Sequence, residues 1–155
     1  MPSNSKLLID IQTASPAIEA ALKKIASSAL IKKWIKAATP LSGLLTLRFV
    51  NSTEGKKLNA AFRKKHYATN VLTFPYEHSK SALSADIIFC LPVIRKEAKE
   101  QGKTVKAHLA HLIVHGCLHA QGLDHEHEKE TKKMEKLEVA LLKKLGFTDP
   151  YLTTQ

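Results

Sequence analysis

Three histidines in the C-terminal third of the sequence have a spacing that suits a metal site. His115 and His119 are four residues apart in a stretch with helical periodicity, so both imidazoles should lie on one side of a helix, one turn apart. Gly122 can adopt the left-handed conformation that ends a helix, and the chain can then bring His125 back towards the other two. Three imidazoles and one open coordination position are typical of a catalytic zinc site, so the sequence predicts one metal ion per chain.

The other donor residues nearby fit a metal site less well. Cys117 is two residues from His115 and is expected to point away from it, so a closed site with thiolate ligands is not indicated. His108 and His111 continue the same side of the helix, and we expect supporting or surface roles for them because a mononuclear site already has its ligands. The residues favour zinc, but three imidazoles also suit nickel or cobalt.

The same histidine spacing occurs in metalloproteases with the pattern H-E-x-x-H-x-x-G-x-x-H. Those enzymes use the glutamate after the first histidine as their general base. Gly116 occupies that position here and cannot accept a proton, and the sequence does not place Glu126 or Glu128 in the site. A peptidase is therefore disfavoured. Hydrolysis of another substrate such as a small phosphoester, and a ribosome- or RNA-binding protein with a structural metal, stay open as alternatives.

The composition favours a polyanionic partner. The 155 residues include 24 Lys and Arg against 14 Asp and Glu, which gives a formal net charge of +10. Nucleic acid is favoured over a membrane because no basic helix with Trp and Phe along its apolar side stands out. The length suits a single domain over residues 1–155, and no apolar run is long enough to span a bilayer. Two cysteines and no signal-peptide pattern indicate a cytoplasmic protein.

Mixed strands and helices must position the histidines, which predicts an α+β (α/β-like) fold. Ser15 and Thr53 are the expected N-caps of two of the helices. Strands are expected at residues 6–12, 44–50, 70–76 and 85–91, with a polar loop between the last two. Helices are expected at residues 16–34 with a possible break at Ser27-Ser28, and at 53–65, 92–101, 104–121 and 128–145.

Two of these helices carry apolar stripes that predict their buried faces. A mid-helix glycine costs roughly 1 kcal/mol relative to alanine, so Gly116 predicts a close contact with its backbone. Gly146 is expected to end the last helix. The stripe of the 104–121 helix, beside the histidines, contains Leu109, Leu112, Ile113, Gly116, Cys117 and Ala120. The stripe of the last helix contains Met134, Leu137, Leu141, Leu142 and Leu145.

Four segments resemble parts of the YbeY family of bacterial rRNA maturation factors. The histidine segment resembles the family signature through His115-Gly116-x-Leu118-His119-x-x-Gly122-x-Asp124-His125. Residues 58–77, LNAAFRKKHYATNVLTFPYE, resemble a second motif, in which a helix ending in L-N-x-x-[YF]-R precedes T-[DN]-V-L-[ST]-F-P. The segment ADIIFC at 85–90 is similar to the strand that follows, and Pro150-Tyr151 is similar to the C-terminal end of the family.

The expected segments give four strands and about five helices. This resemblance implies that the strands form a small, mostly parallel sheet flanked by the helices, with the metal in a cleft. It implies a single-strand-specific, zinc-dependent endoribonuclease that acts in maturation of the 3′ end of 16S rRNA and in ribosome quality control. The implied zinc ligands are His115, His119 and His125, and the implied partners are single-stranded RNA, ribosomal RNA, the ribosome and further proteins.

Arg63 matches the functionally important arginine of the family. The residues alone favour a structural salt bridge for it, whereas the resemblance implies a catalytic role, since a planar guanidinium can bind two phosphate oxygens. The family commonly has Asp where this chain has His66 and Gly where it has Ala85, and neither change removes a ligand. A solvated, RNA-attracting face is expected from four basic residues near Arg63, namely Lys56, Lys57, Lys64 and Lys65.

Overall fold

Four strands form a single mixed sheet in the computed structural model, which describes residues 6–63, 70–78, 82–122 and 128–152. Their order is β1-β2-β4-β3. Strands β1 and β4 both run parallel to β2, and β3 runs antiparallel to β4. The predicted small, mostly parallel sheet is therefore confirmed. The strands are β1 (Leu7–Thr13), β2 (Ser42–Val50), β3 (Val71–His78) and β4 (Ala82–Cys90).

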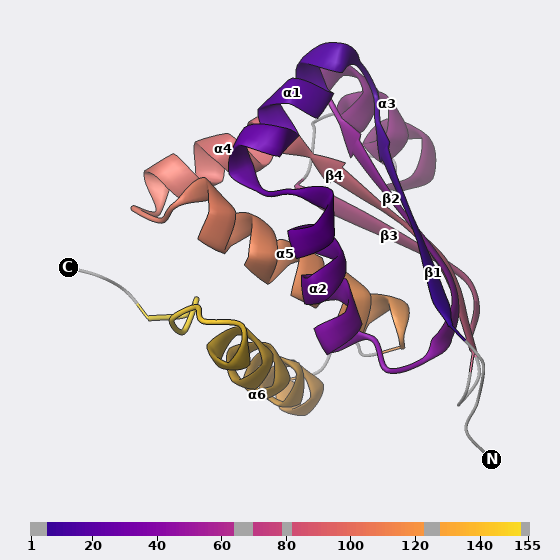
Figure 1. Cartoon of the computed structure of the whole chain (residues 1–155), viewed down its shortest axis with the longest axis vertical. Coiled ribbons are helices and arrows are strands. Elements are labelled where there is room, and N and C mark those ends of the chain that lie inside the picture. Colours follow the sequence, from indigo (N-terminus) through magenta and orange to yellow (C-terminus); the bar gives the residue numbers. More distant parts are fainter. Residues whose placement is uncertain (1–5, 64–69, 79–81, 123–127, 153–155) are drawn as a thin grey trace.

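Helices cover the sheet unequally. Figure 1 shows α1, α2 and α5 on one face of the sheet and α3 at the other, with α6 outside α5. Among the described residues, no helix has the length and apolar character needed to cross a membrane. The described residues form six helices, so the α+β prediction is confirmed with one helix more than the five expected. They are α1 (Pro16–Ile25), α2 (Ser28–Ala38), α3 (Ser52–Arg63), α4 (Leu91–Glu100), α5 (Val105–Ala120) and α6 (Glu128–Lys144).

Capping by serine explains why the first helical stretch is two helices. The Ser15 hydroxyl accepts a hydrogen bond from the Ile18 N–H at 3.2 Å, and the Ser27 hydroxyl accepts one from the Leu30 N–H at 3.1 Å. Between them, Ala26 is extended, with φ −157°. Each hydroxyl satisfies an N–H that has no partner inside its helix. The break expected at Ser27-Ser28 is therefore confirmed.

Two local predictions are wrong. Asn51, rather than Thr53, caps α3, because its side-chain oxygen accepts a hydrogen bond from the Glu54 N–H at 2.9 Å. The polar loop expected between the last two strands is shorter than predicted, because β3 reaches His78 and β4 begins at Ala82. Antiparallel pairing satisfies the backbone groups of these polar residues, and an edge strand such as β3 tolerates polar side chains on its outer face.

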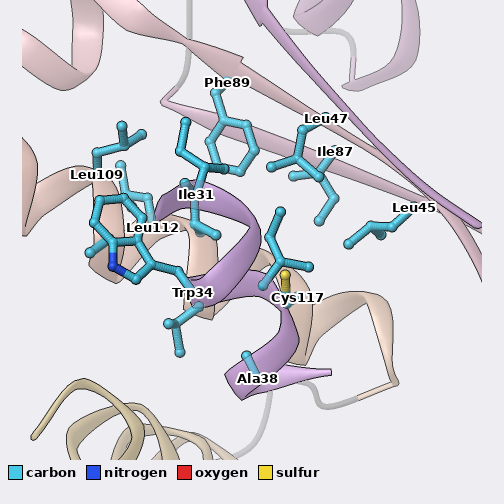
Figure 2. Close-up of a cluster of buried hydrophobic side chains, with 14 of the residues drawn as sticks. Ile31, Trp34, Ala38, Leu45, Leu47, Ile87, Phe89, Leu109, Leu112 and Cys117 are labelled. Atoms are coloured by element: carbon cyan, nitrogen blue, oxygen red, sulfur yellow. The ribbon is translucent and has the colours of Figure 1, made fainter. Parts of the chain in front are cut away.

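The hydrophobic core lies between the sheet, α2 and α5. Trp34 of α2 is 1% exposed, and its ring contacts Phe147, which follows α6, edge to face at 5.7 Å. The whole stripe predicted for the 104–121 helix is buried, which confirms the face that α5 turns to the sheet. Figure 2 shows side chains from the three elements meeting, among them Ile31, Trp34, Leu45, Leu47, Ile87, Phe89, Leu109 and Cys117.

Candidate metal centre

Helix α5 is held at both ends, which fixes the position of its histidines. At its start, the Thr104 hydroxyl accepts a hydrogen bond from the Ala107 N–H at 3.1 Å. At its end, Gly122 has φ +93°, the left-handed conformation that the sequence predicts there. The Gln121 side-chain amide donates to the Ala38 carbonyl oxygen at 2.7 Å and so ties the end of α5 to α2.

Three half-buried histidines form a row along one side of α5. The ring centroids of His111 and His115 are 6.3 Å apart. Those of His115 and His119 are 6.2 Å apart, with their planes within 9° of parallel. The structure thus brings His115 and His119 together as their spacing predicts. His125 lies outside the described residues, so the three-histidine ligand set stays a prediction.

The backbone of α5 lies close to the sheet at Gly116. A Cβ atom on Gly116 would meet the Cγ2 atom of Ile87 at 3.1 Å and the Cγ2 atom of Val71 at 3.6 Å. Ile87 is fully buried in the core. The close contact predicted at this glycine is confirmed, and it allows the histidine row to lie near the sheet.

Replacement of Gly116 by valine should therefore destabilise the fold. Two further carbon atoms beyond Cβ must enter space next to Ile87, and overpacking of this kind costs about 1–3 kcal/mol. Urea denaturation should show a lower midpoint for Gly116→Val than for Ala107→Val, a half-exposed control on the same helix with the same β-branched residue. Equal midpoints for the two variants would contradict the close contact.

A buried carboxylate joins the histidine row to α6 and the C-terminal segment. Glu138 of α6 is 1% exposed, and its Oε1 atom lies 2.6 Å from His111 Nε2 and 3.3 Å from His115 Nδ1. The Tyr151 hydroxyl donates a hydrogen bond to the same oxygen at 2.8 Å. Three side chains, two from α5 and one from the C-terminal segment, therefore converge on one oxygen atom of Glu138.

The charge state of this cluster follows from its hydrogen bonds. Burial by itself would raise the pKa of Glu138, but the bonds from His111 and His115 outweigh it and lower the pKa to about 2. Burial and the bond to Glu138 raise the pKa of Tyr151. The carboxylate is consequently ionised and only accepts hydrogen bonds, whereas the phenol keeps its proton and donates it.

His111, His115 and Glu138 have ligand atoms within 4.8 Å of one another, so this group could hold a metal ion. Two ligands bound at about 2.0 Å to a tetrahedral ion lie about 3.3 Å apart. His111 Nε2 and Glu138 Oε1 are closer than this, at 2.6 Å, which is a hydrogen-bond distance. In this structure the carboxylate is therefore a hydrogen-bond acceptor, and His115 belongs both to this group and to the predicted ligand set.

Glu138 and Tyr151 are the residues of this cluster that the sequence interpretation missed. It placed Leu137 on the buried stripe of the last helix, which is wrong: Leu137 is 38% exposed, and Glu138 takes the inner position. Glu138 is four residues after Met134 and four before Leu142, both of which are buried. A carboxylate in register with such a stripe is the signal that could have found it, because buried acids are almost always paired.

The remaining predicted residues are placed as follows. Lys56 and Lys57 are exposed on α3. Cys117 is fully buried in the core, away from the histidine row as expected, and burial raises its pKa to about 12. Ala85 is buried in β4, where its methyl group joins the core. Arg63 is the last residue of α3, but its side chain lies outside the described part of the chain, as do Lys64, Lys65 and His66.

A cavity of about 520 Å³ opens beside the cluster, with His111, Tyr151 and Glu97 in its lining. The cavity adjoins the end of the histidine row at which His111 contacts Glu138. The cleft predicted around the metal itself stays a prediction, because residues 123–127, which include His125, are outside the described ranges.

A family model described as Endoribonuclease YbeY matches residues 6–146. The chain belongs to the YbeY family. A YbeY protein of Polynucleobacter asymbioticus, named Endoribonuclease YbeY, is 99% identical over 155 residues and is covered completely, as is this chain. The YbeY protein of Paraburkholderia phytofirmans, with the same name, is 49% identical over 147 residues, which cover 94% of this chain and 96% of that protein.

A solved structure has a similar fold. The solution structure of a Thermotoga maritima protein is similar with a TM-score of 0.54 and 22% sequence identity, covering 94% of this chain and 99% of the other. At that identity the likeness concerns the fold alone. The family resemblance inferred from the sequence motifs is confirmed by the YbeY match over most of the chain.

Proposed function

We propose that this chain is a single-domain, zinc-dependent endoribonuclease that cuts single-stranded RNA in the cytoplasm. Its proposed role is maturation of the 3′ end of 16S rRNA and ribosome quality control, in contact with the ribosome and further proteins. Membership of the YbeY family, whose curated relatives are named endoribonucleases, is the observation that carries this proposal. The net charge of +10 supports a polyanionic substrate.

The donor chemistry of the histidine row fits a zinc ion. We propose His115, His119 and His125 as its ligands, one ion per chain, with nickel and cobalt as ions that the same donors accept. His115 and His119 present nearly parallel rings one helical turn apart. When bound, such an ion supplies a Lewis acid that polarises a phosphate oxygen and lowers the pKa of water to roughly 7.

The basic residues of α3 supply the proposed contacts with RNA. Arg63, at the end of α3, would bind a phosphate with its planar guanidinium and offset negative charge that develops at phosphorus. Lys56 and Lys57 are exposed on the same helix and would attract the RNA backbone, together with Lys64 and Lys65 that follow it. Gly116 provides no proton acceptor after the first histidine, which keeps a peptidase disfavoured.

Cleavage of a labelled rRNA fragment tests the proposal directly. A single-stranded fragment and the same fragment in a duplex are incubated with the untreated protein, the chelated protein and the chelated protein given back zinc. We expect the single strand alone to be shortened, the activity to disappear on chelation and to return with about one equivalent of zinc. Circular dichroism of the chelated protein should still show the folded chain.

Other outcomes would favour the alternatives. Loss of the fold on chelation would make the metal structural. A change in RNA mobility without shortening would indicate a ribosome- or RNA-binding factor, and cleavage that survives complete removal of the metal would contradict the zinc-dependent mechanism. Cobalt and nickel added in place of zinc show which of the three ions supports turnover.

A further inference from the structure

We infer that Glu138 is a positioning residue that orients His115 for metal binding and fixes which of its ring nitrogens carries the proton. This inference rests on the proposed function. Its basis is the convergence of His111, His115 and Tyr151 on one oxygen of a carboxylate that is 1% exposed. Burial of an unpaired carboxylate costs free energy, so a carboxylate this buried requires the hydrogen bonds that these three side chains donate.

The geometry selects one tautomer of His115. Glu138 faces Nδ1 of His115 at 3.3 Å, and an ionised carboxylate can only accept, so Nδ1 must carry the proton. In a neutral imidazole the other nitrogen, Nε2, then has the lone pair that a metal requires. Isolated histidine prefers the opposite form, with the proton on Nε2. Metal-binding histidines commonly donate their second ring N–H to a carboxylate in this way.

The other two partners hold the carboxylate in place. The Tyr151 hydroxyl lies 2.8 Å from Glu138 Oε1 and 3.2 Å from His111 Nε2, so it fastens the segment after α6 to the cluster. His111 donates through Nε2 at 2.6 Å. Its Nδ1 atom is buried and has no hydrogen-bond partner among the described residues, so that nitrogen is shielded from any metal. His111 and Tyr151 therefore hold Glu138 in place, and neither of them offers a ligand atom to the metal ion.

A second carboxylate–histidine pair, whose histidine also lies on α5, provides a matched control. Glu97 of α4 accepts a hydrogen bond from Nε2 of His108 at 3.0 Å, and His108 is 5% exposed. This pair repeats the carboxylate–histidine contact one helical turn before His111 and outside the proposed ligand set. Replacement of Glu97 should remove one carboxylate–histidine hydrogen bond from α5, as replacement of Glu138 does, without changing the position of the proton on His115.

The test reads the histidine ring nitrogens of the metal-free, nitrogen-15-labelled full chain by long-range proton–nitrogen NMR. We compare wild type, Glu138→Met, Glu138→Gln and Glu97→Met. His115 should have the proton on Nδ1 in the wild type and in Glu97→Met. It should shift towards the Nε2–H form in Glu138→Met, which has no acceptor, and keep an intermediate population in Glu138→Gln, whose amide oxygen still accepts.

Zinc affinity is measured on the same proteins by competition with a chromophoric chelator. Loss of a carboxylate behind a metal-binding histidine typically weakens binding about 10–100-fold, which is the effect expected for Glu138→Met. Glu138→Gln should lose less, and Glu97→Met should bind as the wild type does. If Glu138→Met does not fold, Glu138→Gln and Tyr151→Phe supply the same comparison, each with a weaker effect.

The outcomes separate this inference from the proposed function. Zinc binding by a wild type whose His115 carries its proton on Nε2 would overturn the inference alone, as would unchanged zinc affinity in both Glu138 variants. A second zinc ion that binds the wild type and is lost in Glu138→Met would overturn it too, because Glu138 would then be a ligand itself. No zinc binding by the wild type would overturn the proposed function and this inference with it.

Discussion

Replacement of His115 by alanine is expected to remove the metal from the protein and to abolish RNA cleavage. The side chain is half-buried and lies on the side of α5 next to the core-facing stripe, so its truncation should leave the fold intact. With one of three proposed imidazole ligands gone, metal content should fall from about one ion per chain to near zero. Elemental analysis after dialysis measures the metal content, cleavage of the labelled rRNA fragment measures the activity, and circular dichroism checks that the variant is folded.

His115 alone does not distinguish the two groups that contain it. His119→Ala and His111→Ala make that distinction, because His119 belongs to the predicted ligand set, and His111 belongs to the cluster around Glu138. We expect His119→Ala to lose the metal and His111→Ala to keep about one ion per chain, bound more weakly. Loss of the metal in His111→Ala with full metal content in His119→Ala would refute the proposed ligands.

Replacement of Arg63 by alanine should lower the rate of RNA cleavage on the order of 100-fold or more, with metal content unchanged. The reason is that removing one hydrogen-bond donor from a developing oxyanion typically costs 100- to 1,000-fold in turnover. Single-turnover cleavage of the labelled rRNA fragment, with the protein in excess and at saturating concentration, separates the cleavage step from RNA binding.

Two controls separate catalysis from attraction of RNA. Arg63→Lys keeps the charge but loses the two-pronged contact, so it should restore binding better than turnover. Lys56→Ala should weaken RNA binding and reduce its salt dependence, since it removes a phosphate contact, while turnover at saturation stays near the wild-type value. Wild-type turnover in Arg63→Ala would make Arg63 a structural residue.

The parts of the fold that the sequence predicted depend on local signals. Ser15 before Pro16, and Ser27 after Ile25, mark helix starts through side chains that act within three residues. The stripe of α5 follows from helical periodicity, and the break at Gly122 follows from a conformation that few other residues adopt. These features need no knowledge of the partner segments, so they can be inferred from sequence.

The features that the sequence predicts wrongly or does not reveal depend on contacts between distant segments. The hairpin of β3 and β4 extends past the expected strand ends because each strand satisfies the backbone of the other. The rotation of α6, which buries Glu138 and exposes Leu137, is set by its packing on α5. Tyr151 enters the cluster only because the segment after α6 returns to α5. Helical periodicity alone does not decide which of two neighbouring residues, here Leu137 and Glu138, faces the core.

The role proposed for Arg63 depends on family resemblance and not on a local signal in the sequence. Its neighbours in sequence predict a basic helix end, but they do not distinguish a phosphate contact from a salt bridge. The family resemblance favours a phosphate contact, the match over residues 6–146 shows membership of the YbeY family, and the role of Arg63 stays a prediction. His115 and His119, in contrast, were inferred from spacing alone, and the structure places their rings side by side.

The central claim is that one metal ion lies on the histidine row, and anomalous scattering from crystals of the zinc-loaded protein tests it most directly. Difference maps on the two sides of the zinc absorption edge locate the ion without reference to any assumed ligand. We predict a single peak about 2.0–2.1 Å from ring nitrogens of His115, His119 and His125. A peak between His111, His115 and Glu138 instead, or no peak at all, would contradict the account.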